Sequence, residues 1–466
     1  MLRILLALAA LLALPVAATA QPISPAEQAR IDAAVSQSLA AYQVPSASIA
    51  IVRGGRIVLA KAYGKASERL PVARADLPYQ IASISKQFTA AALLLLEDEG
   101  KLSLDDPVSK YLPGVSGGDR IRIRQLLSHT SGLQDYWPQD YSFAAMSRPV
   151  SPEAIVDRWG RKPLDFEPGT QWQYSNTGYV VAGLIAQEVA GEPLLSLLQK
   201  RIFRPLGMRS VLDQDRAVGA RFPQGYGRAA LGPVRPAQPA ASGWLFAAGE
   251  LSMTAEDLAR WDIARMNRAL LPAEDWAEQE RTVKLTGGKD SGYGLGVFVG
   301  ERGGRKLVSH TGEAVGFLSV NNVFPDDRAA VVVLTNSWSG AAFTDIARKV
   351  AEVVLPARPS PAGADVAVTA RARALFDELR RGELDRARVT DNLAFYFTPQ
   401  VRRDFQQSLG ALGEPTGFTA EGEPALRGGF VTRRFKVTYP GSTLTISAFT
   451  ETGADPRFEQ FLVSPE

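Results

Sequence analysis

Two different spacings of apolar residues open the chain. Residues 24–42 begin with the capping sequence Ser-Pro-Ala-Glu and then place an apolar residue at every third or fourth position, which predicts an amphipathic helix. Residues 46–53 and 56–63 are instead β-branched and apolar runs, separated by Gly54 and Gly55. Such a pair of runs around two glycines predicts an antiparallel hairpin.

The middle of the chain is helical and the strands return late. The segment 81–100 is apolar on nearly every side and ends at Gly100, which predicts a buried helix. Further helices are predicted at residues 151–160, 178–192, 252–267 (capped by Thr254) and 341–354, and strands at 305–310, 316–324 and 329–335. Strands first and last, with helices between them, predict an α/β (α+β) domain with a central antiparallel sheet, flanking helices and a helical insertion.

A second, smaller unit follows a proline-rich segment. Residues 356–363, PARPSPAG, have the composition of a linker. Beyond it, helical patterns at 366–381, 383–391 and 399–412 precede strand patterns at 429–439, 442–450 and 457–463. We therefore expect an accessory α+β domain at residues 364–466, whose order of helices and strands resembles cystatin-like or NTF2-like accessory domains.

The first twenty residues and the composition restrict the cellular context and the chemistry. Residues 1–20 combine Arg3, an apolar run and a small-residue ending, which predicts a signal peptide, so we expect residues 21–355 to form the main domain of a periplasmic or secreted protein without a stable membrane anchor. The 466 residues include no cysteine, which excludes disulfides and thiolate ligands.

Charge and histidine content narrow the partners. The formal net charge is only +3, with no block of basic residues, which argues against nucleic acid as a partner. Two histidines leave no His-rich metal site, and we expect neither a metal nor an organic cofactor. The oligomeric state is left open.

Ser83 and Lys86 are the first candidates for chemistry. They form an S-x-x-K sequence at the start of the predicted buried helix, where residues three apart share a face. The lysine amine can then serve as the base for the serine hydroxyl, beside the positive end of a helix that favours an oxyanion. An ordinary helix N-terminus would show the same four residues, so other segments must decide.

Tyr174 and Asn176 supply the second motif, Y-x-N, just before a predicted helix. Side chains two apart in an extended segment point the same way. The phenol can relay a proton, and the amide can hold a substrate carbonyl while it orients Lys86. Packing is the alternative role for the tyrosine.

The third motif is His310-Thr311-Gly312, predicted at the end of a strand, where Gly312 would let the backbone approach a ligand. A plain strand end is the alternative. The three motifs occur once each and in this order, which favours a shared site for a small-molecule or peptide substrate.

With these motifs the chain resembles the penicillin-recognising serine hydrolases, specifically the class C β-lactamase-related family of D,D-peptidases, D-aminopeptidases and esterases. The resemblance spans residues 28–354 and includes IASISKQFTA, LLSHTSGL, PGTQWQYSNTGY, AAGELSMTAEDLARW, YGLGV and SHTGEAVGF. It implies an exported hydrolase that forms an acyl-enzyme on Ser83 with Lys86 as base and Tyr174 as proton relay. It also implies Asn176, His310, Thr311 and Gly312 as substrate-binding residues, and an oxyanion hole from the backbone N–H groups of Ser83 and Glu313.

One departure from the family bears on the substrate. His310 stands where β-lactamases of this group have lysine, which disfavours β-lactamase activity relative to peptide, amide or ester hydrolysis. We expect His310 to titrate near its ordinary pKa of about 6.5 and to meet a substrate carboxylate when protonated.

Two alternatives remain. A penicillin-binding-type sensor or scaffold for D-peptides would bind without turnover, although it has no need of a base. His129 with Asp135 or Asp140 suggests a Ser-His-Asp triad, which we disfavour because Ser83 already has a base in register.

Overall fold

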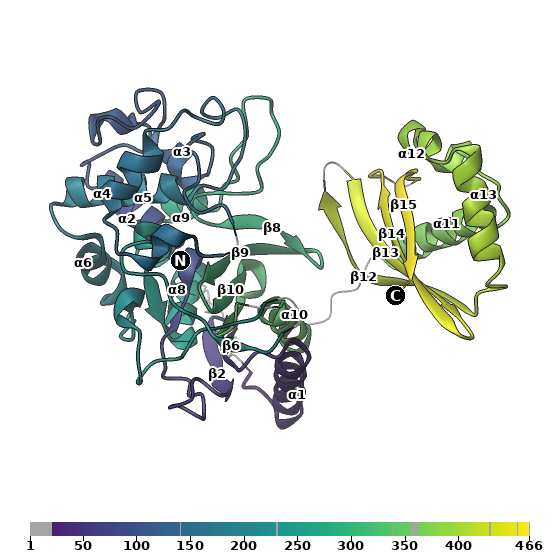
Figure 1. Ribbon diagram of the computed structural model, residues 1–466, viewed down its shortest axis with the longest axis horizontal. Helices are drawn as coiled ribbons and strands as arrows, with labels where there is room; N and C mark the ends of the chain where they lie inside the picture. Colours follow the sequence, from purple (N-terminus) through teal and green to yellow (C-terminus); the bar gives the residue numbers. More distant parts are fainter. Residues whose placement is uncertain are drawn as a thin grey trace, which may run out of the picture. The chain divides into compact units, whose positions relative to one another are not determined.

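The computed structural model describes residues 21–139, 141–229, 232–338, 340–355, 362–427, 430–453 and 455–465 (Figure 1). The predicted signal peptide and most of the predicted linker therefore lie outside the described residues. The chain divides into two compact units: one runs to Val299 and resumes from Leu307 to Leu355, and the other comprises Gly300–Lys306 and the chain from Pro356 onward.

A six-stranded sheet in the order β2-β1-β11-β10-β9-β8 forms the frame of the main unit. All the pairs from β2 to β9 are antiparallel, and β1 aligns with β11 from Ala47 opposite Thr335 to Val52 opposite Ala330. The predicted antiparallel sheet, built from both ends of the domain, is confirmed. The strands are β1 (Ser46–Arg53), β2 (Arg56–Gly64), β8 (Phe298–Arg302), β9 (Arg305–Ala314), β10 (Phe317–Phe324) and β11 (Ala329–Thr335).

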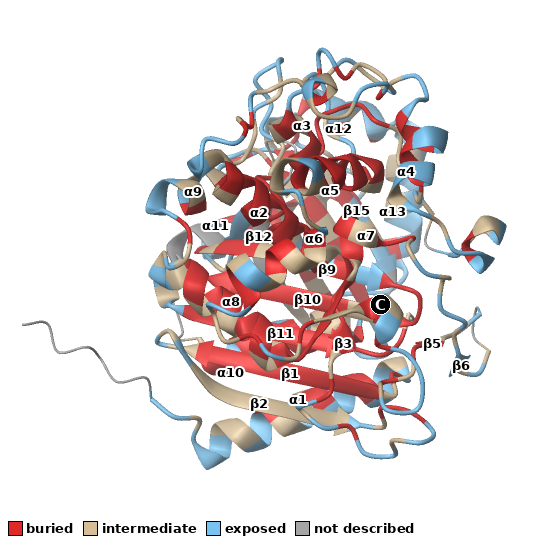
Figure 2. Cartoon of the chain, turned by 90° about the vertical axis from the view of Figure 1, so that its left-hand side faces the viewer, coloured by how far each residue is buried: buried red, intermediate tan, exposed pale blue. Residues whose placement is uncertain are grey.

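The central strands are buried on both faces, which explains their continuous apolar sequences. Because side chains alternate along a strand, Ala50 and Val52 of β1 join the large core under the helical insertion, whereas Ile49 and Ile51 join a second core. That second core lies beneath α1 (Pro25–Tyr42) and α10 (Ala342–Val354), which pack on one another. Figure 2 shows the central strands and the helices α2 and α5 as the buried interior.

The helical insertion packs around two buried helices. α2 (Lys86–Asp98) is buried at every residue from Lys86 to Leu94 and contacts α5 (Asn176–Ala190). The other helices are α3 (Ile123–Leu127), α4 (Pro152–Ile155), α6 (Leu194–Leu198), α7 (Phe246–Gly249), α8 (Ala255–Asn267) and α9 (Ala273–Gln279), with π-helical turns at Val156–Gly160 and Gln199–Phe203. Thr254 caps α8 as predicted, because its side chain accepts the Asp257 N–H.

Short strands, which the sequence pattern did not predict, hold the start of α2. β3 (Tyr79–Gln80), β7 (Leu251–Met253) and β4 (Leu212–Asp213) form a three-stranded sheet in the order β3-β7-β4, and β5 (Tyr226–Gly227) pairs with β6 (Arg235–Pro236). A 3₁₀ turn, Ala82–Ser85, joins β3 to α2. Strands of two or three residues carry too few alternating positions to be recognised from sequence.

β9 is longer than predicted. It continues to Ala314, which pairs with Phe317 of β10 across a tight turn, so His310, Thr311 and Gly312 lie within the strand and not at its end. The alternation of apolar and polar residues that marks a strand cannot be recognised at residues 309–314, because polar residues alternate there with small ones. β8 was not predicted either.

The C-terminal unit is an α+β domain of helices followed by a four-stranded sheet, β12-β13-β14-β15. The helix predicted at 383–391 is wrong: only the short α12 forms, after a 3₁₀ turn at Arg386–Arg388. β12 was missed because its register shifts between Glu421 and Ala425, which breaks the alternation. The elements are α11 (Ala362–Arg380), α12 (Asp391–Tyr396), α13 (Pro399–Gly410), β12 (Gly417–Arg427), β13 (Phe430–Tyr439), β14 (Ser442–Thr450) and β15 (Phe458–Pro465).

None of the described helices is by itself long and apolar enough to cross a bilayer. One bent pair of helices, Asn176–Ala190 and Leu194–Phe203 with 71° between them, has the required length and apolar composition when the two are taken together.

The separate cores predict that the main unit folds alone. The two cores of the main unit draw buried residues only from Ile31 to Val354, and the core of the second unit draws them only from Val368 to Phe461. A chain ending at Leu355 should therefore stay soluble, with a cooperative melting transition within about 5 °C of the full chain. Circular dichroism melts of both chains check this, and aggregation of the shortened chain would contradict it.

Candidate active site

The Lys86 amine lies at the centre of a polar cluster inside the main unit. It is fully buried, 3.0 Å from the Ser83 Oγ, 2.8 Å from the Asn176 Oδ1 and 2.7 Å from the Ala248 carbonyl oxygen. Ser83 lies on the 3₁₀ turn and Lys86 begins α2, so one helical turn brings them together. Asn176 begins α5 and Ala248 lies in α7, which explains why no sequence spacing could identify all three partners.

These contacts give the lysine a defined proton arrangement. Burial lowers the pKa of Lys86 to about 7, against a raising effect of the Asp135 charge. A neutral amine has two N–H donors and one lone pair. The amide oxygen of Asn176 and the carbonyl of Ala248 can only accept, so they take the two donors. The lone pair then faces the one partner that carries a proton, the Ser83 hydroxyl.

Asp135 holds Asn176 in the orientation that this arrangement requires. The carboxylate accepts the Asn176 backbone N–H at 3.1 Å and its side-chain Nδ2 at 3.3 Å. Because a carboxylate can only accept, the NH₂ group must point to Asp135 and the oxygen to Lys86. Burial raises the pKa of Asp135, while the hydrogen bonds from Trp137 and Asn176 oppose that shift. From the sequence, Asp135 was a candidate only for a Ser-His-Asp triad, and its role in positioning Asn176 was not predicted.

Tyr174 lies over the lysine. The amine is 4.8 Å from the centre of its ring, and the Ser83 hydroxyl acts on the phenol by lowering its pKa. Burial raises the pKa of Tyr174, and the charges of Asp135 and Glu313 raise it further, so the phenol is neutral near pH 7. A neutral phenol between a serine and an amine can pass a proton without holding a charge.

The loop that carries Tyr174 is hydrogen-bonded to the loop at residues 128–134. The Gly169 N–H donates to the Thr130 carbonyl, the Gln173 N–H to the His129 carbonyl, and the Ser175 N–H to the His129 Nδ1 at 3.1 Å. The His129 ring stacks on Tyr174 with 4.1 Å between ring centres. The position of the phenol therefore depends on the histidine loop.

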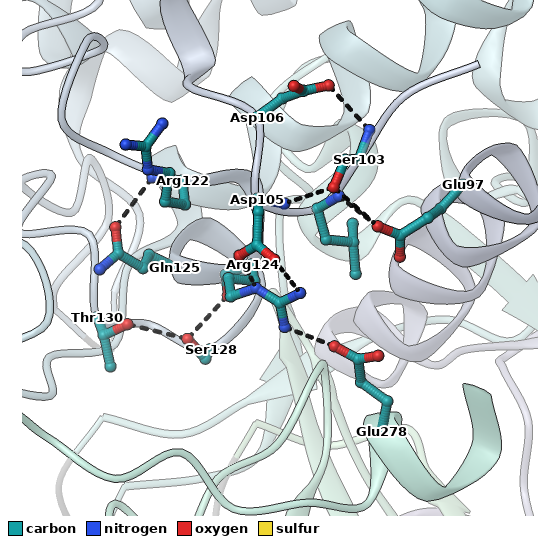
Figure 3. Close-up of polar contacts among 11 residues, drawn as sticks. Glu97, Ser103, Asp105, Asp106, Arg122, Arg124, Gln125, Ser128, Thr130 and Glu278 are labelled. Carbon is teal, nitrogen blue, oxygen red and sulfur yellow. Dashed lines mark hydrogen bonds and ion pairs between the residues drawn. The ribbon is translucent and has the colours of Figure 1, made fainter. Parts of the chain in front are cut away.

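A polar network in turn anchors that loop (Figure 3). Arg124 of α3 pairs with Asp105 and with Glu278 of α9, while the Ser128 Oγ donates to the Arg124 carbonyl at 2.8 Å and lies 2.9 Å from the Thr130 Oγ1. These bonds tie the end of α3 to the first residues of the histidine loop.

Backbone strain and a glycine position the nucleophile. Ala82, the residue before Ser83, has φ of +49°, a left-handed conformation that costs about 1–3 kcal/mol for a residue other than glycine. Gly312 of β9 lies against the carbonyl of Ile81: a Cβ at residue 312 would lie 2.0 Å from that oxygen. Gly312 therefore lets β9 touch the segment that leads into Ser83. That it also admits a ligand stays a prediction.

The expected titration of His310 is wrong. Its side chain is 2% exposed, and burial together with the nearby Lys86 lowers its pKa to about 3. The Nδ1 lies 2.6 Å from the Thr311 carbonyl, which can only accept, so this nitrogen carries the proton and Nε2 accepts from the Tyr293 hydroxyl at 2.8 Å. The neutral ring is fully engaged and offers no charge to a substrate carboxylate.

The remaining candidates are placed as follows. Thr311 and Glu313 are exposed, alternating along β9 with the buried His310 and Gly312, and Glu313 accepts a bond from the Trp338 indole. The structure gives His129 no contact with Asp135, and burial lowers its pKa well below the ordinary value, which leaves no base for a triad. Asp140 lies outside the described residues. Over the described part of the chain, no group of three or more acidic or histidine residues is arranged to hold a metal ion.

The reactivity of Ser83 should follow the titration of Lys86. Only the neutral amine can accept a proton, so the rate of labelling by a fluorophosphonate should rise with pH, with a midpoint near 7, and then level off. His310, with a pKa of about 3, should add no transition near pH 6. Labelling rates measured between about pH 5 and pH 11 check this; a midpoint near about 10.4, the ordinary value for lysine, would show that the amine is solvated.

Asp135→Asn should separate the two effects of Asp135. The variant keeps an oxygen for the Asn176 N–H but removes the charge that raises the pKa of Lys86, so the midpoint of labelling should move to lower pH. The plateau rate should fall by about tenfold because Asn176 loses its fixed orientation. Asp119→Asn, at an exposed site, is the matched control. An unchanged midpoint would show that Asp135 does not act on Lys86.

Comparisons with known proteins agree with this geometry. Residues 31–355 match the Beta-lactamase family. The chain is 28% identical over 311 residues to the putative penicillin-binding protein PbpX of Bacillus subtilis strain 168, a match that covers 66% of this chain and 75% of that protein. It is 29% identical over 325 residues to a D-aminopeptidase of Gluconobacter oxydans strain 621H, covering 67% of this chain and 60% of that protein.

A solved structure supports the same relationship. The D-stereospecific amidohydrolase from a Streptomyces species has a TM-score of 0.59 and 31% identity, and the similarity covers 69% of this chain and 98% of that one. The family match spans more than half of the chain and includes the serine, the lysine and the tyrosine described above. The chain therefore belongs to the β-lactamase family and is a serine hydrolase.

Proposed function

We propose that this protein is an exported serine hydrolase that forms an acyl-enzyme on Ser83 and cleaves amide or peptide bonds of D-amino-acid derivatives. The similarity to a D-aminopeptidase and to a D-stereospecific amidohydrolase supports this substrate class. The observation that carries the proposal is the lone pair of Lys86, which has the Ser83 hydroxyl as its one proton-bearing partner.

The residues account for each proton in the reaction. As the Ser83 Oγ bonds to the substrate carbonyl carbon, its proton moves to the Lys86 amine, 3.0 Å away. The oxyanion would be held by the backbone N–H of Ser83, in the first turn of a helix where an N–H has no acceptor within the helix, together with the backbone N–H of Glu313 on β9. The Tyr174 hydroxyl then passes the proton to the leaving nitrogen as the C–N bond breaks. In the second half of the reaction, water attacks the acyl carbon of the ester on Ser83. The proton of the water moves by the same path in reverse, through Tyr174 and Lys86, and a proton returns to the Ser83 oxygen as its bond to the acyl carbon breaks.

The buried histidine bears on the choice of substrate. Since His310 is neutral and bonded on both ring nitrogens, this position of β9 offers no fixed cation for a carboxylate beside the scissile bond. Neutral amides, peptides and esters thus fit this site better than penicillins. The signal-like residues 1–20 support export, and sequencing the N-terminus of the protein recovered from a periplasmic or culture fraction tests it, with Gln21 expected first.

Intact mass spectrometry tests the acyl-enzyme. The wild-type protein should gain one fluorophosphonate adduct and should hydrolyse p-nitrophenyl acetate, whereas Ser83→Ala should lose both, with a fall in esterase rate of at least about 10³-fold. Ser147→Ala, an exposed serine in a 3₁₀ turn, is the matched control and should behave like the wild type. Full activity in Ser83→Ala would refute the proposed nucleophile.

The same method separates hydrolysis from binding. An acyl adduct from a D-alanine ester should appear and then decay as water releases the acid. A stable adduct would favour the sensor or scaffold function over the hydrolase.

A further inference from the structure

Thr89 is a polar residue of the buried helix α2 that the mechanism above does not use. It lies three residues after Lys86, so the two side chains project from the same face of the helix. The residue is 1% exposed, and its hydroxyl donates to the carbonyl oxygen of Ala247 at 2.8 Å. A threonine within a helix commonly returns its hydroxyl to a carbonyl of the preceding turn. Thr89 instead bonds to α7, 158 residues later in the sequence.

Thr89 and Lys86 bind adjacent carbonyls at the end of α7. The Lys86 amine donates to the Ala248 carbonyl at 2.7 Å, next to the Ala247 carbonyl that accepts from Thr89. These carbonyls belong to the last turn of a four-residue helix, where a helix supplies no N–H donors of its own. Two donors one turn apart on α2 therefore bind two consecutive acceptors on α7.

The backbone N–H that would otherwise reach the Ala247 carbonyl is used elsewhere. In a continuing helix this donor would be the N–H of Leu251, four residues on. That N–H donates to the Ser85 Oγ at 3.2 Å, because the chain leaves α7 and enters β7 at this point. The Thr89 hydroxyl thus takes the place of the missing helical donor. A buried carbonyl without a donor is costly, so removing the hydroxyl should turn this peptide.

The orientation of these carbonyls matters to the base. A neutral Lys86 has two N–H groups, and its lone pair faces the Ser83 hydroxyl only while acceptors hold both of them. One acceptor, the Asn176 amide oxygen, is fixed by a carboxylate, as described above. The other acceptor, the Ala248 carbonyl, lies beside the carbonyl that Thr89 holds. Thr89 therefore acts on the second of the two contacts that direct the lone pair.

Packing also restrains α7, but in a way that does not orient its carbonyls. A Cβ at Gly183 of α5 would lie 2.3 Å from the Ala247 Cβ and 2.8 Å from a ring carbon of Phe246, so α5 lies directly against α7. Apolar contacts of this kind are non-directional and act on side chains. The hydrogen bond from Thr89 acts on the carbonyl itself and weakens steeply when its angle is poor.

We propose that Thr89 is a positioning residue for the base: its hydroxyl fixes the end of α7, so that the Ala248 carbonyl holds one N–H of Lys86 and the lone pair faces Ser83. This inference rests on the proposed acyl-enzyme function. It extends the machinery to a residue that neither gives nor takes a proton in the reaction.

Two substitutions at Thr89 separate the hydroxyl from the packing. Thr89→Val keeps the branched shape but removes the donor, and it should lower the plateau rate of fluorophosphonate labelling by about tenfold. Thr89→Ser keeps the donor but loses a methyl group, and it should restore most of the labelling rate. Because the plateau is measured above the pKa of Lys86, where the amine is neutral, a changed pKa cannot produce the loss.

Ser38→Ala is the matched control for the loss of a buried hydroxyl. Ser38 of α1 is fully buried and donates to the Ala34 carbonyl at 2.9 Å, in the layer on the other face of the sheet. Its plateau should equal that of the wild type, with every rate measured at a temperature where melting curves show each variant folded. A wild-type plateau in Thr89→Val, no recovery in Thr89→Ser, or an equal loss in Ser38→Ala would overturn the inference.

A double variant tests whether Thr89 acts through Lys86. Asp135→Asn loosens the other acceptor of the amine, so it and Thr89→Val disturb the same lone pair. Their combined loss should be well below the product of the two single losses, about a hundredfold, which independent sites would give. A combined loss equal to that product would overturn the assignment.

Failure of this inference can be told apart from failure of the proposed function. If Ser83 of the wild type forms an adduct that turns over, but Thr89→Val is labelled equally fast, the hydrolase stands and Thr89 has no positioning role. If Ser83 of the wild type forms no adduct at all, the proposed function itself is wrong.

Discussion

The burial of one amine is the constraint on which the rest of this structure depends. A solvated lysine is an ammonium near neutral pH and cannot accept a proton. Lys86 is useful because the large core around α2 and α5 excludes water from it and lowers its pKa to about 7. The same burial requires that its N–H groups be satisfied, which Asn176 and Ala248 do. The packing of the core around α2 and α5 is therefore also what makes Lys86 able to act as a base.

The sheet holds the residues around the nucleophile in fixed positions. β1 and β11 are apolar on both faces and hold a core on each side, so the sheet is a rigid frame between the α1–α10 layer and the helical insertion. β9 extends from this frame and touches the Ile81 carbonyl through Gly312, where any side chain would collide. This contact, with the bonds that β7 makes to the start of α2, holds Ala82 in its strained conformation. The strain is local, and the stability of the frame offsets it.

Desolvation also determines the charge pattern around the nucleophile. It lowers the pKa of His310 to about 3 and so removes the cation that a lysine at this position would supply. The strand on this side of the nucleophile therefore presents a neutral ring at residue 310.

Local sequence determined the elements and the reactive residues, because caps, periodicity and short motifs depend on neighbours within a few positions. The capping box of Ser24, the hairpin at Gly54–Gly55 and the S-x-x-K and Y-x-N motifs all belong to this class. Tertiary structure alone decided the length of β9, the position of Gly312 against Ile81, the link from Asp135 to Asn176 and the neutral state of His310. Each of these depends on water exclusion or on contact between segments far apart in the chain, and no pattern along the sequence records either.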